Sequence, residues 1–132
     1  VYTVRNKEML MPQLIKVFQI VIDKNLADLI NKEGWDCHVN AKAYIESRNG
    51  KPSIGLANGC YTHVGNIIAD DIDHAFEASG MAQMDRIQRI APKMMTVSVG
   101  DILVAEDGAW FCDSIGWLEV DEDKLTTNWK AA

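Results

Sequence analysis

The segment 96–120 constrains the fold most, because its local signals agree almost residue by residue. It reads TVSVGDILVAEDGAWFCDSIGWLEV. Short runs of apolar, β-branched and aromatic residues lie at 102–105, 109–113 and 117–120. An Asp-Gly pair separates the first two runs and a Ser-Ile-Gly triplet the last two, and both are typical of tight hairpin turns. We therefore predict a three-stranded antiparallel meander. Its faces are filled by Trp110, Phe111, Cys112, Trp117 and Leu118.

Length and composition indicate one ordinary globular domain. The chain has 132 residues, of which 48% are apolar and 24% charged. A chain of this size buries enough surface to fold without disulfides or a metal. We treat 1–132 as a single domain, with 96–120 as its meander core and 121–132 as an acidic, frayed tail. Because we find no run of about 18 apolar residues and no signal-peptide core near the start, we expect a cytoplasmic protein without a membrane span.

A long amphipathic helix is predicted over 13–32. Pro12 suits the first turn of a helix, and Gly34 suits its C-terminal stop. Between them, apolar residues recur at the spacing of one helical face. They are Leu14, Ile15, Phe18, Val21, Ile22, Leu26, Leu29 and Ile30. We expect this face to cover the sheet, and the alternative is that it binds a partner.

The segment 35–59 admits two interpretations. In the first, 35–40 are extended and 41–48 form two turns of helix. In the second, 43–46 and 53–56 pair as a hairpin across an Asn-Gly-Lys-Pro turn. The residue pattern is compatible with both.

Two short helices are predicted after this segment. Asp70 and Asp71 are placed to cap a helix over 72–79, where their charges also favour the first turn. Gly80 is its stop. A second short helix is predicted at 81–90, because its apolar residues are spaced by three.

Strands are predicted at 1–5 and at 61–68, with Gly65 at a bulge in the second. Together the elements define an α+β fold. One long N-terminal amphipathic helix and several short helices pack on an antiparallel sheet that ends in the three-stranded meander.

No catalytic or metal-binding constellation stands out, so we assign no catalytic residue, metal or cofactor. Zinc sites take four ligands, usually in local pairs. Only Cys60 and His63 have a suitable gap, and no second pair matches it. Cys112 is expected to lie buried in a strand, where its pKa is raised and the thiol is inert. Neither a GxGxxG motif nor a phosphate-binding P-loop occurs.

The polar residues of the turns around the meander form the candidate partner-binding site. Ser98 and Asp101 precede its first strand, and Asp113 and Ser114 follow its second. In one interpretation their side chains hydrogen-bond the backbone and stabilise the turns. In the functional one, both turns lie at the same end of the meander and form a recognition surface, to which Trp117 also contributes.

Two motifs resemble the signature of the YodL-like domain, a family of small proteins from phages, plasmids and other mobile elements. SVGDI at 98–102 resembles the first half of that signature, and FCDSIGW at 111–117 the second. The segment at 70–81 resembles the acidic helix that precedes them, and VYTVR resembles the family's first strand. The resemblance covers roughly 61–120 and that strand. It implies an accessory protein with a counter-defence or host-takeover role that binds a host protein.

We therefore expect a non-enzymatic protein that acts in the host cytoplasm. Its net charge of −6 argues against direct nucleic-acid binding, which rests on Lys and Arg that neutralise phosphates. Two alternatives stay open. One is an acidic mimic that occupies the DNA or RNA site of a host enzyme. The other is a small hydrolase that uses Asp101 and Asp113, or a cysteine.

Overall fold

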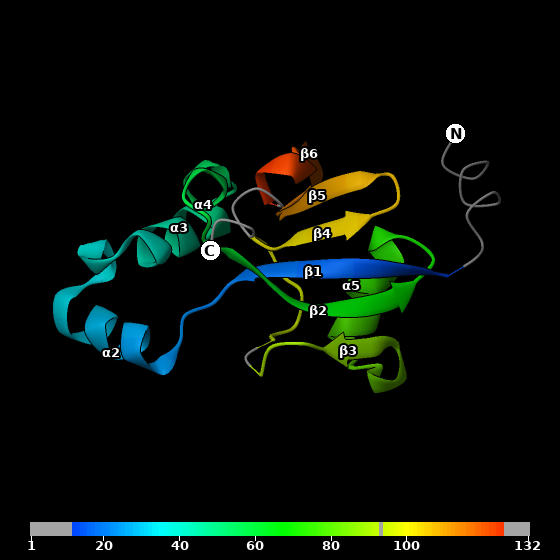
Figure 1. Cartoon of the computed structure of the whole chain (residues 1–132), viewed down its shortest axis with the longest axis horizontal. Helices are drawn as coiled ribbons and strands as arrows, with labels where there is room; N and C mark the ends of the chain where they lie inside the picture. Colours follow the sequence, from blue (N-terminus) through cyan, green and yellow to red (C-terminus); the bar gives the residue numbers. More distant parts are fainter. Residues whose placement is uncertain (1–11, 93, 126–132) are drawn as a thin grey trace.

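The computed structural model describes residues 12–92 and 94–125, and within them six strands form one antiparallel sheet (Figure 1). The strands are β1 (Gln13–Ile20), β2 (Tyr61–Ala69), β3 (Ile87–Arg89), β4 (Ile102–Ala105), β5 (Gly108–Asp113) and β6 (Gly116–Val120). Their order across the sheet is β3-β2-β1-β4-β5-β6. The predicted α+β class and antiparallel sheet are confirmed. The strand predicted at 1–5 lies outside the described residues.

β1 takes the place of the first half of the predicted long helix, so that prediction is wrong. The strand pairs with β2 on one side and β4 on the other. Ile15 and Val17 are buried while Leu14 and Lys16 are exposed, which is the alternation of a strand. After Val17 the strand is buried on both faces, and apolar residues on both faces also satisfy helical spacing. Hydrogen bonding to the two neighbouring strands, β2 and β4, favours a strand over a helix here. The spacing of apolar residues does not reveal this pairing.

Only the second half of that prediction is helical, as α2 (Lys24–Glu33). Asp23 begins the helix, because its carboxylate accepts a hydrogen bond from the backbone N–H of Leu26 at 2.8 Å. Gly34 ends it with a φ of +91°, a left-handed conformation that glycine adopts readily. The predicted stop at Gly34 is confirmed.

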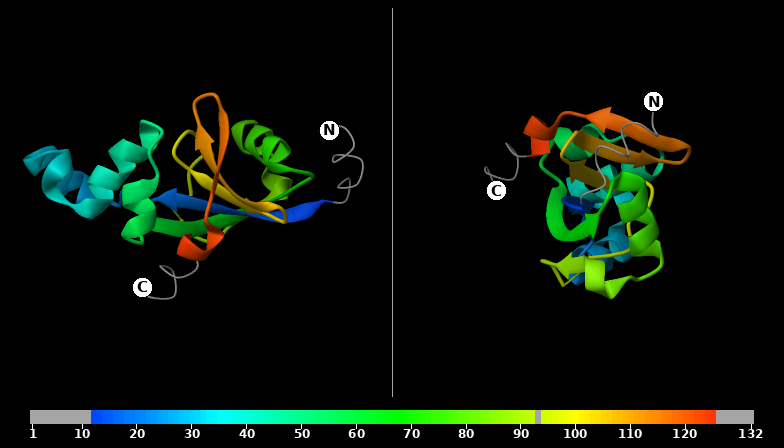
Figure 2. Two further views of the ribbon diagram at one scale, coloured as in Figure 1. Left: turned by 90° about the horizontal axis from the view of Figure 1, so that it is seen from above. Right: turned by 90° about the vertical axis from the view of Figure 1, so that its right-hand side faces the viewer.

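The segment 35–59 is helical, which excludes the hairpin interpretation. A 3-10 turn, η1 (Trp35–Cys37), is followed by α3 (Val39–Arg48) and α4 (Ser53–Ala57). The helical turns predicted over 41–48 are confirmed, and the extended structure predicted for 35–40 is wrong. Nδ1 of His38 accepts a hydrogen bond from the backbone N–H of Asn40 at 3.0 Å and so caps α3 within that stretch. Figure 2 shows α2, α3 and α4 gathered at one end of the sheet.

β2 and α5 (Ile72–Gly80) match their predictions closely. Val17 of β1 pairs with Gly65, and the next residue, Phe18, pairs with His63, so β2 carries an extra residue at this point. The bulge predicted at Gly65 is therefore confirmed. Asp71 begins α5, because its carboxylate accepts a hydrogen bond from the backbone N–H of His74 at 2.8 Å.

The helix predicted over 81–90 is wrong. The chain forms a 3-10 turn there, η2 (Met84–Arg86), and then enters β3. Ala82 has a φ of +53°, and this left-handed residue interrupts any helical continuation of α5. Ile87 pairs with Ile67 of β2 and packs on the core, so the apolar spacing serves a strand.

Two apolar clusters lie on opposite faces of the sheet. The first joins strand residues such as Ile15 and Leu103 to α5. The second joins Phe18 and Phe111 to α3 and α4. Residues 122–125, within the predicted frayed tail, form a helical turn, and Leu125 packs into the second cluster with 4% exposure. In the part of the chain that the structure describes, no helix has the length and apolar character needed to cross a membrane.

The predicted meander is confirmed to within one residue at each strand end. Phe111 and Cys112 are buried as expected. Trp110 and Trp117 are only half-buried, and Leu118 is 47% exposed. Trp117 and Leu118 lie on β6, which is the last strand of the sheet and has a neighbouring strand on one side only.

Candidate binding site

The turn at 98–101 leads the chain into β4 and is closed by Asp101. Oδ2 of Asp101 accepts a hydrogen bond from the backbone N–H of Ser98 at 2.9 Å, and the backbone N–H of Asp101 donates to the Ser98 carbonyl at 3.1 Å. Gly100 has a φ of +101°, and a Cβ there would lie 2.8 Å from Oγ of Ser47 on α3. The role predicted for Asp101 in stabilising this turn is confirmed.

Gln19 of β1 ties this turn to the centre of the sheet. Its side-chain nitrogen donates to Oδ2 of Asp101 at 3.0 Å and to the carbonyl of Met95 at 2.8 Å. Its side-chain oxygen accepts from the backbone N–H of Met95 at 3.0 Å. Gln19 is 5% exposed and Asp101 is 4% exposed, so this network lies out of bulk water. Buried polar groups need such partners, and here the partners fix the turn.

Arg48, in the last turn of α3, reaches the same turn from the helical end of the molecule. Its guanidinium donates to Oγ of Ser98 at 2.7 Å, to the carbonyl of Val99, and to the hydroxyl of Tyr44 at 3.0 Å. Its central carbon also lies 4.6 Å from the centre of the Tyr44 ring. Trp35 stacks on Tyr44 with ring centres 5.7 Å apart. These contacts hold the guanidinium in one place.

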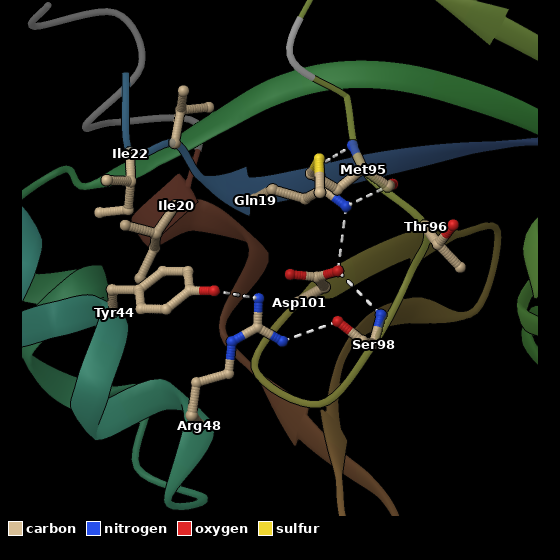
Figure 3. A pocket seen from close by; sticks show the side chains of 10 residues that line it. Gln19, Ile20, Ile22, Tyr44, Arg48, Met95, Thr96, Ser98 and Asp101 are labelled. Carbon is tan, nitrogen blue, oxygen red and sulfur yellow. Dashed lines mark hydrogen bonds between the residues drawn. The ribbon is translucent and has the colours of Figure 1, made fainter. Parts of the chain in front are cut away.

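The polar groups line a cavity of about 460 Å³ (Figure 3). Ile20 and Ile22 form its apolar wall on the side of β1, and Met95 lies on the opposite side. Figure 3 shows that the second carboxyl oxygen of Asp101 points away from Ser98 and into the space beside Tyr44. Apolar walls with a few fixed polar atoms, in a volume of roughly 300–1,000 Å³, are typical of binding sites.

Asp101 and Arg48 face this cavity without touching. Burial raises the pKa of Asp101 from 3.8 to about 6, while hydrogen bonds from Ser98 and Gln19 and the charge of Arg48 oppose the rise. Both residues are described, and no nitrogen of Arg48 lies within 4.0 Å of an Asp101 carboxyl oxygen. At neutral pH the cavity therefore holds a largely ionised carboxylate and a guanidinium that do not pair directly.

Tyr61 supports the turn from beneath. Its hydroxyl donates to the carbonyl of Gly100 at 2.8 Å. Burial, and then the nearby charge of Asp101, raises the pKa of Tyr61, so it stays a neutral donor. Partners from three other elements, Gln19 of β1, Arg48 of α3 and Tyr61 of β2, thereby position the turn.

The structure separates the five site residues predicted from the sequence. Ser98 and Asp101 lie together at the cavity. Asp113 and Ser114 form the next turn at the same end of the meander, as predicted. Oδ1 of Asp113 accepts a hydrogen bond from the backbone N–H of Ser114 at 2.8 Å, and neither residue lines the cavity. This turn therefore stabilises its own backbone.

Trp117 lies apart from the other four predicted residues. Its indole N–H donates to Oδ1 of Asp73 on α5 at 3.0 Å. Its ring meets Phe76 of the same helix edge to face, with ring centres 6.1 Å apart. Trp117 thus fastens β6 to α5, and the structure does not bring it into one site with Asp101.

Sequence reasoning missed Gln19, Tyr44 and Arg48. Gln19 falls within the helix predicted over 13–32 but outside its apolar face, although a lone amide inside the apolar run VFQIVI was a usable signal of a buried polar contact. Tyr44 and Arg48 lie one helical turn apart on α3 and so share a face. That signal was available only for the helical interpretation of 41–48.

The other candidate chemistries find no support in the described residues. Burial raises the pKa of the Cys60 and Cys112 thiols, that of Cys112 to about 11, so both are protonated at neutral pH. Between residues 12 and 125, with residue 93 left aside, no group of three or more His, Cys, Asp or Glu side chains could hold a metal ion. The carboxylates of Asp71 and Asp73 are engaged by His74 and Trp117.

Comparison with known proteins found no match to this chain among family models, curated proteins or solved structures. Function is therefore inferred from the site and from the sequence motifs.

Proposed function

We propose that this chain is a non-enzymatic accessory protein of a phage or other mobile element, and that it binds a host protein through the cavity between Arg48 and Asp101. One observation carries the proposal: a carboxyl and a guanidinium face the same cavity, each is held by other hydrogen bonds, and no direct ion pair joins them. Polar groups fixed in this way keep hydrogen-bonding capacity for a partner. The motifs SVGDI and FCDSIGW, which resemble the YodL-like signature, supply the turn and the strand beside it.

Recognition suits this arrangement better than catalysis does. A serine nucleophile needs a base that removes its proton, but Oγ of Ser98 accepts a hydrogen bond from Arg48. Among the described residues that line the cavity there is no histidine and no cysteine. Asp113, the second carboxylate that a hydrolase pair would use, does not line it. No hydrogen bond joins the Ser98 hydroxyl to Asp101, the carboxylate that lines the cavity beside it, so no nucleophile is paired with a base there and the fixed donors and acceptors favour binding.

Capture of host proteins from a lysate tests the proposal with two matched variants. Met95 and Met81 are both exposed, at 69% and 66%, but only Met95 lines the cavity. Met95→Glu and Met81→Glu add the same charge at a similar exposure. We expect a host protein that wild type and Met81→Glu retain and that Met95→Glu loses.

Equal retention by the two variants would contradict a role for the cavity. Retention of no host protein above background by wild type would contradict the binding function. If wild type turns over a substrate and Met95→Glu does not, an enzymatic function would replace the proposed binding function.

A further inference from the structure

The cavity has unused hydrogen-bonding capacity of two opposite kinds. Oδ2 of Asp101 accepts from Ser98 and Gln19, while the other oxygen points into the cavity and takes part in no hydrogen bond within the described chain. Arg48 uses three of its N–H groups on Ser98, Val99 and Tyr44. A guanidinium carries five, so two have no acceptor among the described residues. Asp101 therefore offers an unused acceptor, and Arg48, which lines the same cavity, retains unused donors.

The charges of Asp101 and Arg48 restrict which ligand groups can bind to both residues at once. A ligand ammonium at Asp101 would also meet the guanidinium of Arg48, and a ligand carboxylate at Arg48 would also meet Asp101. A neutral group that donates at one end and accepts at the other satisfies both walls without repulsion. A primary carboxamide is such a group, because its NH₂ donates while its carbonyl accepts.

The remaining walls are apolar and suit a short hydrocarbon stem. Ile20 and Ile22 line the cavity on one side, and the side chain of Met95 lies on the other (Figure 3). Methionine adapts its shape to what it contacts. A glutamine or asparagine side chain has the matching construction, with methylene groups behind a terminal carboxamide.

We propose that the cavity between Arg48 and Asp101 is a carboxamide site, and that it takes the side chain of a glutamine or asparagine of the partner. This assignment of the partner's side chain rests on the proposed function. The carboxamide NH₂ donates to the free oxygen of Asp101, and its carbonyl accepts from Arg48. A small-molecule amide carries the same chemistry, and the experiment separates the two sources.

The first experiment titrates wild-type protein with four probes that share a carbon chain and differ in the head group: pentanamide, pentylamine, pentanoate and pentanol. The methyl NMR signals of Ile20, Ile22 and Met95 report on binding at neutral pH. We expect pentanamide to shift them and to bind at least about ten-fold more tightly than the other three. Tighter or equal binding of the amine, acid or alcohol would overturn the assignment, and so would the absence of any shift.

A variant pair tests the role of the guanidinium. Arg48→Met should weaken pentanamide binding by at least about ten-fold. Arg86→Met, which removes an arginine on η2 outside the cavity, should leave it unchanged. Unchanged binding in Arg48→Met would overturn the inference. If that variant does not fold, the four-probe series on wild type still decides it.

Short capped peptides with a central glutamine, glutamate or lysine then identify the source. Binding of the glutamine peptide alone supports a side chain of a protein partner. Binding of pentanamide without the glutamine peptide would overturn that source and favour a small-molecule amide. Because the probes need no host protein, the result is independent of the capture experiment. If no host protein is captured but the glutamine peptide binds, only the proposed function is contradicted. If a host protein is captured but the glutamine peptide does not bind, only this inference is contradicted.

Discussion

Gln19 and Met95 pair as neighbouring strand residues do, although one member of the pair is a side chain. The amide of Gln19 donates to the Met95 carbonyl at 2.8 Å and accepts from its N–H at 3.0 Å. Gln13, at the other end of β1, bonds the backbone of two different loops. Its side chain donates to the carbonyl of Asp70 at 3.0 Å and accepts from the N–H of Glu106 at 2.8 Å. The central strand therefore fixes loop backbone at both of its ends through buried glutamines.

Gln19→Leu should lower the free energy of unfolding by about 2–4 kcal/mol, because each buried polar group left without a partner costs about 1–3 kcal/mol. The substitution removes the partners of both Met95 backbone groups and one donor to Asp101. Urea denaturation measures the effect. Lys16→Leu, at an exposed position of the same strand, is the control and should change stability by less than about 0.5 kcal/mol. Equal stability of Gln19→Leu and wild type would show that water replaces the amide.

Gly100→Ala should destabilise the protein by about 2 kcal/mol or more, because a left-handed backbone costs a non-glycine residue about 1–3 kcal/mol. The added Cβ would also lie 2.8 Å from Oγ of Ser47. Gly80→Ala is the matched control: at the end of α5 a Cβ meets nothing within 4 Å, and alanine is favoured in a helix. Thermal melts should therefore move in opposite directions for the two variants, and a shift in the same direction would contradict this account of the turn.

The meander could be predicted from the sequence because its determinants are local. The Asp107-Gly108 turn and the alternating residues on either side lie next to one another in the chain. The role of Asp101 in its own turn was predictable for the same reason, since Ser98 is three residues away.

The rest of the site could not be predicted, because it forms between distant elements. Gln19 meets Asp101 across 82 residues, and Arg48 meets Ser98 across 50. The strand β1 was also mistaken for a helix: once both its faces are buried, apolar spacing no longer distinguishes the two structures. With β1 misassigned, the buried position of Gln19 could not be inferred.

Trp117→Ala should cost about 2 kcal/mol, below the roughly 3–5 kcal/mol of a fully buried tryptophan, because the ring is only half-buried. The alanine variant loses the hydrogen bond to Asp73 and the edge-to-face contact with Phe76, a type of contact worth about 0.5–1.5 kcal/mol. Trp117→Phe keeps a ring against Phe76 and isolates the hydrogen bond. Leu118→Ala, next on β6 and 47% exposed, should cost less than about 1 kcal/mol. Denaturant midpoints decide the order, and an unchanged midpoint for Trp117→Ala would show that β6 is not fastened to α5 in solution.

Asp101→Asn should gain stability relative to wild type as the pH rises. The folded-state pKa of Asp101, about 6, lies above its ordinary value of 3.8, so the folded protein holds this proton more tightly than the unfolded chain. Wild type is therefore most favoured by this group below about pH 4, and it loses that stabilisation as the pH rises through about 6. A shift of this size corresponds to about 3 kcal/mol.

Asparagine stays neutral, and its carbonyl can accept the same hydrogen bonds from Ser98 and Gln19. The free energy of unfolding of Asp101→Asn minus that of wild type should therefore rise by up to about 3 kcal/mol between about pH 4 and pH 7. We expect a cost of about 1 kcal/mol at the acid end and a neutral or stabilising effect at neutral pH. Urea denaturation at closely spaced pH values measures the difference, with Asp113→Asn at the exposed neighbouring turn as the control. A stability difference that does not change with pH would show that burial does not raise the pKa of Asp101. If Asp101→Asn instead loses stability relative to wild type as the pH rises, attraction to Arg48 outweighs the cost of burial.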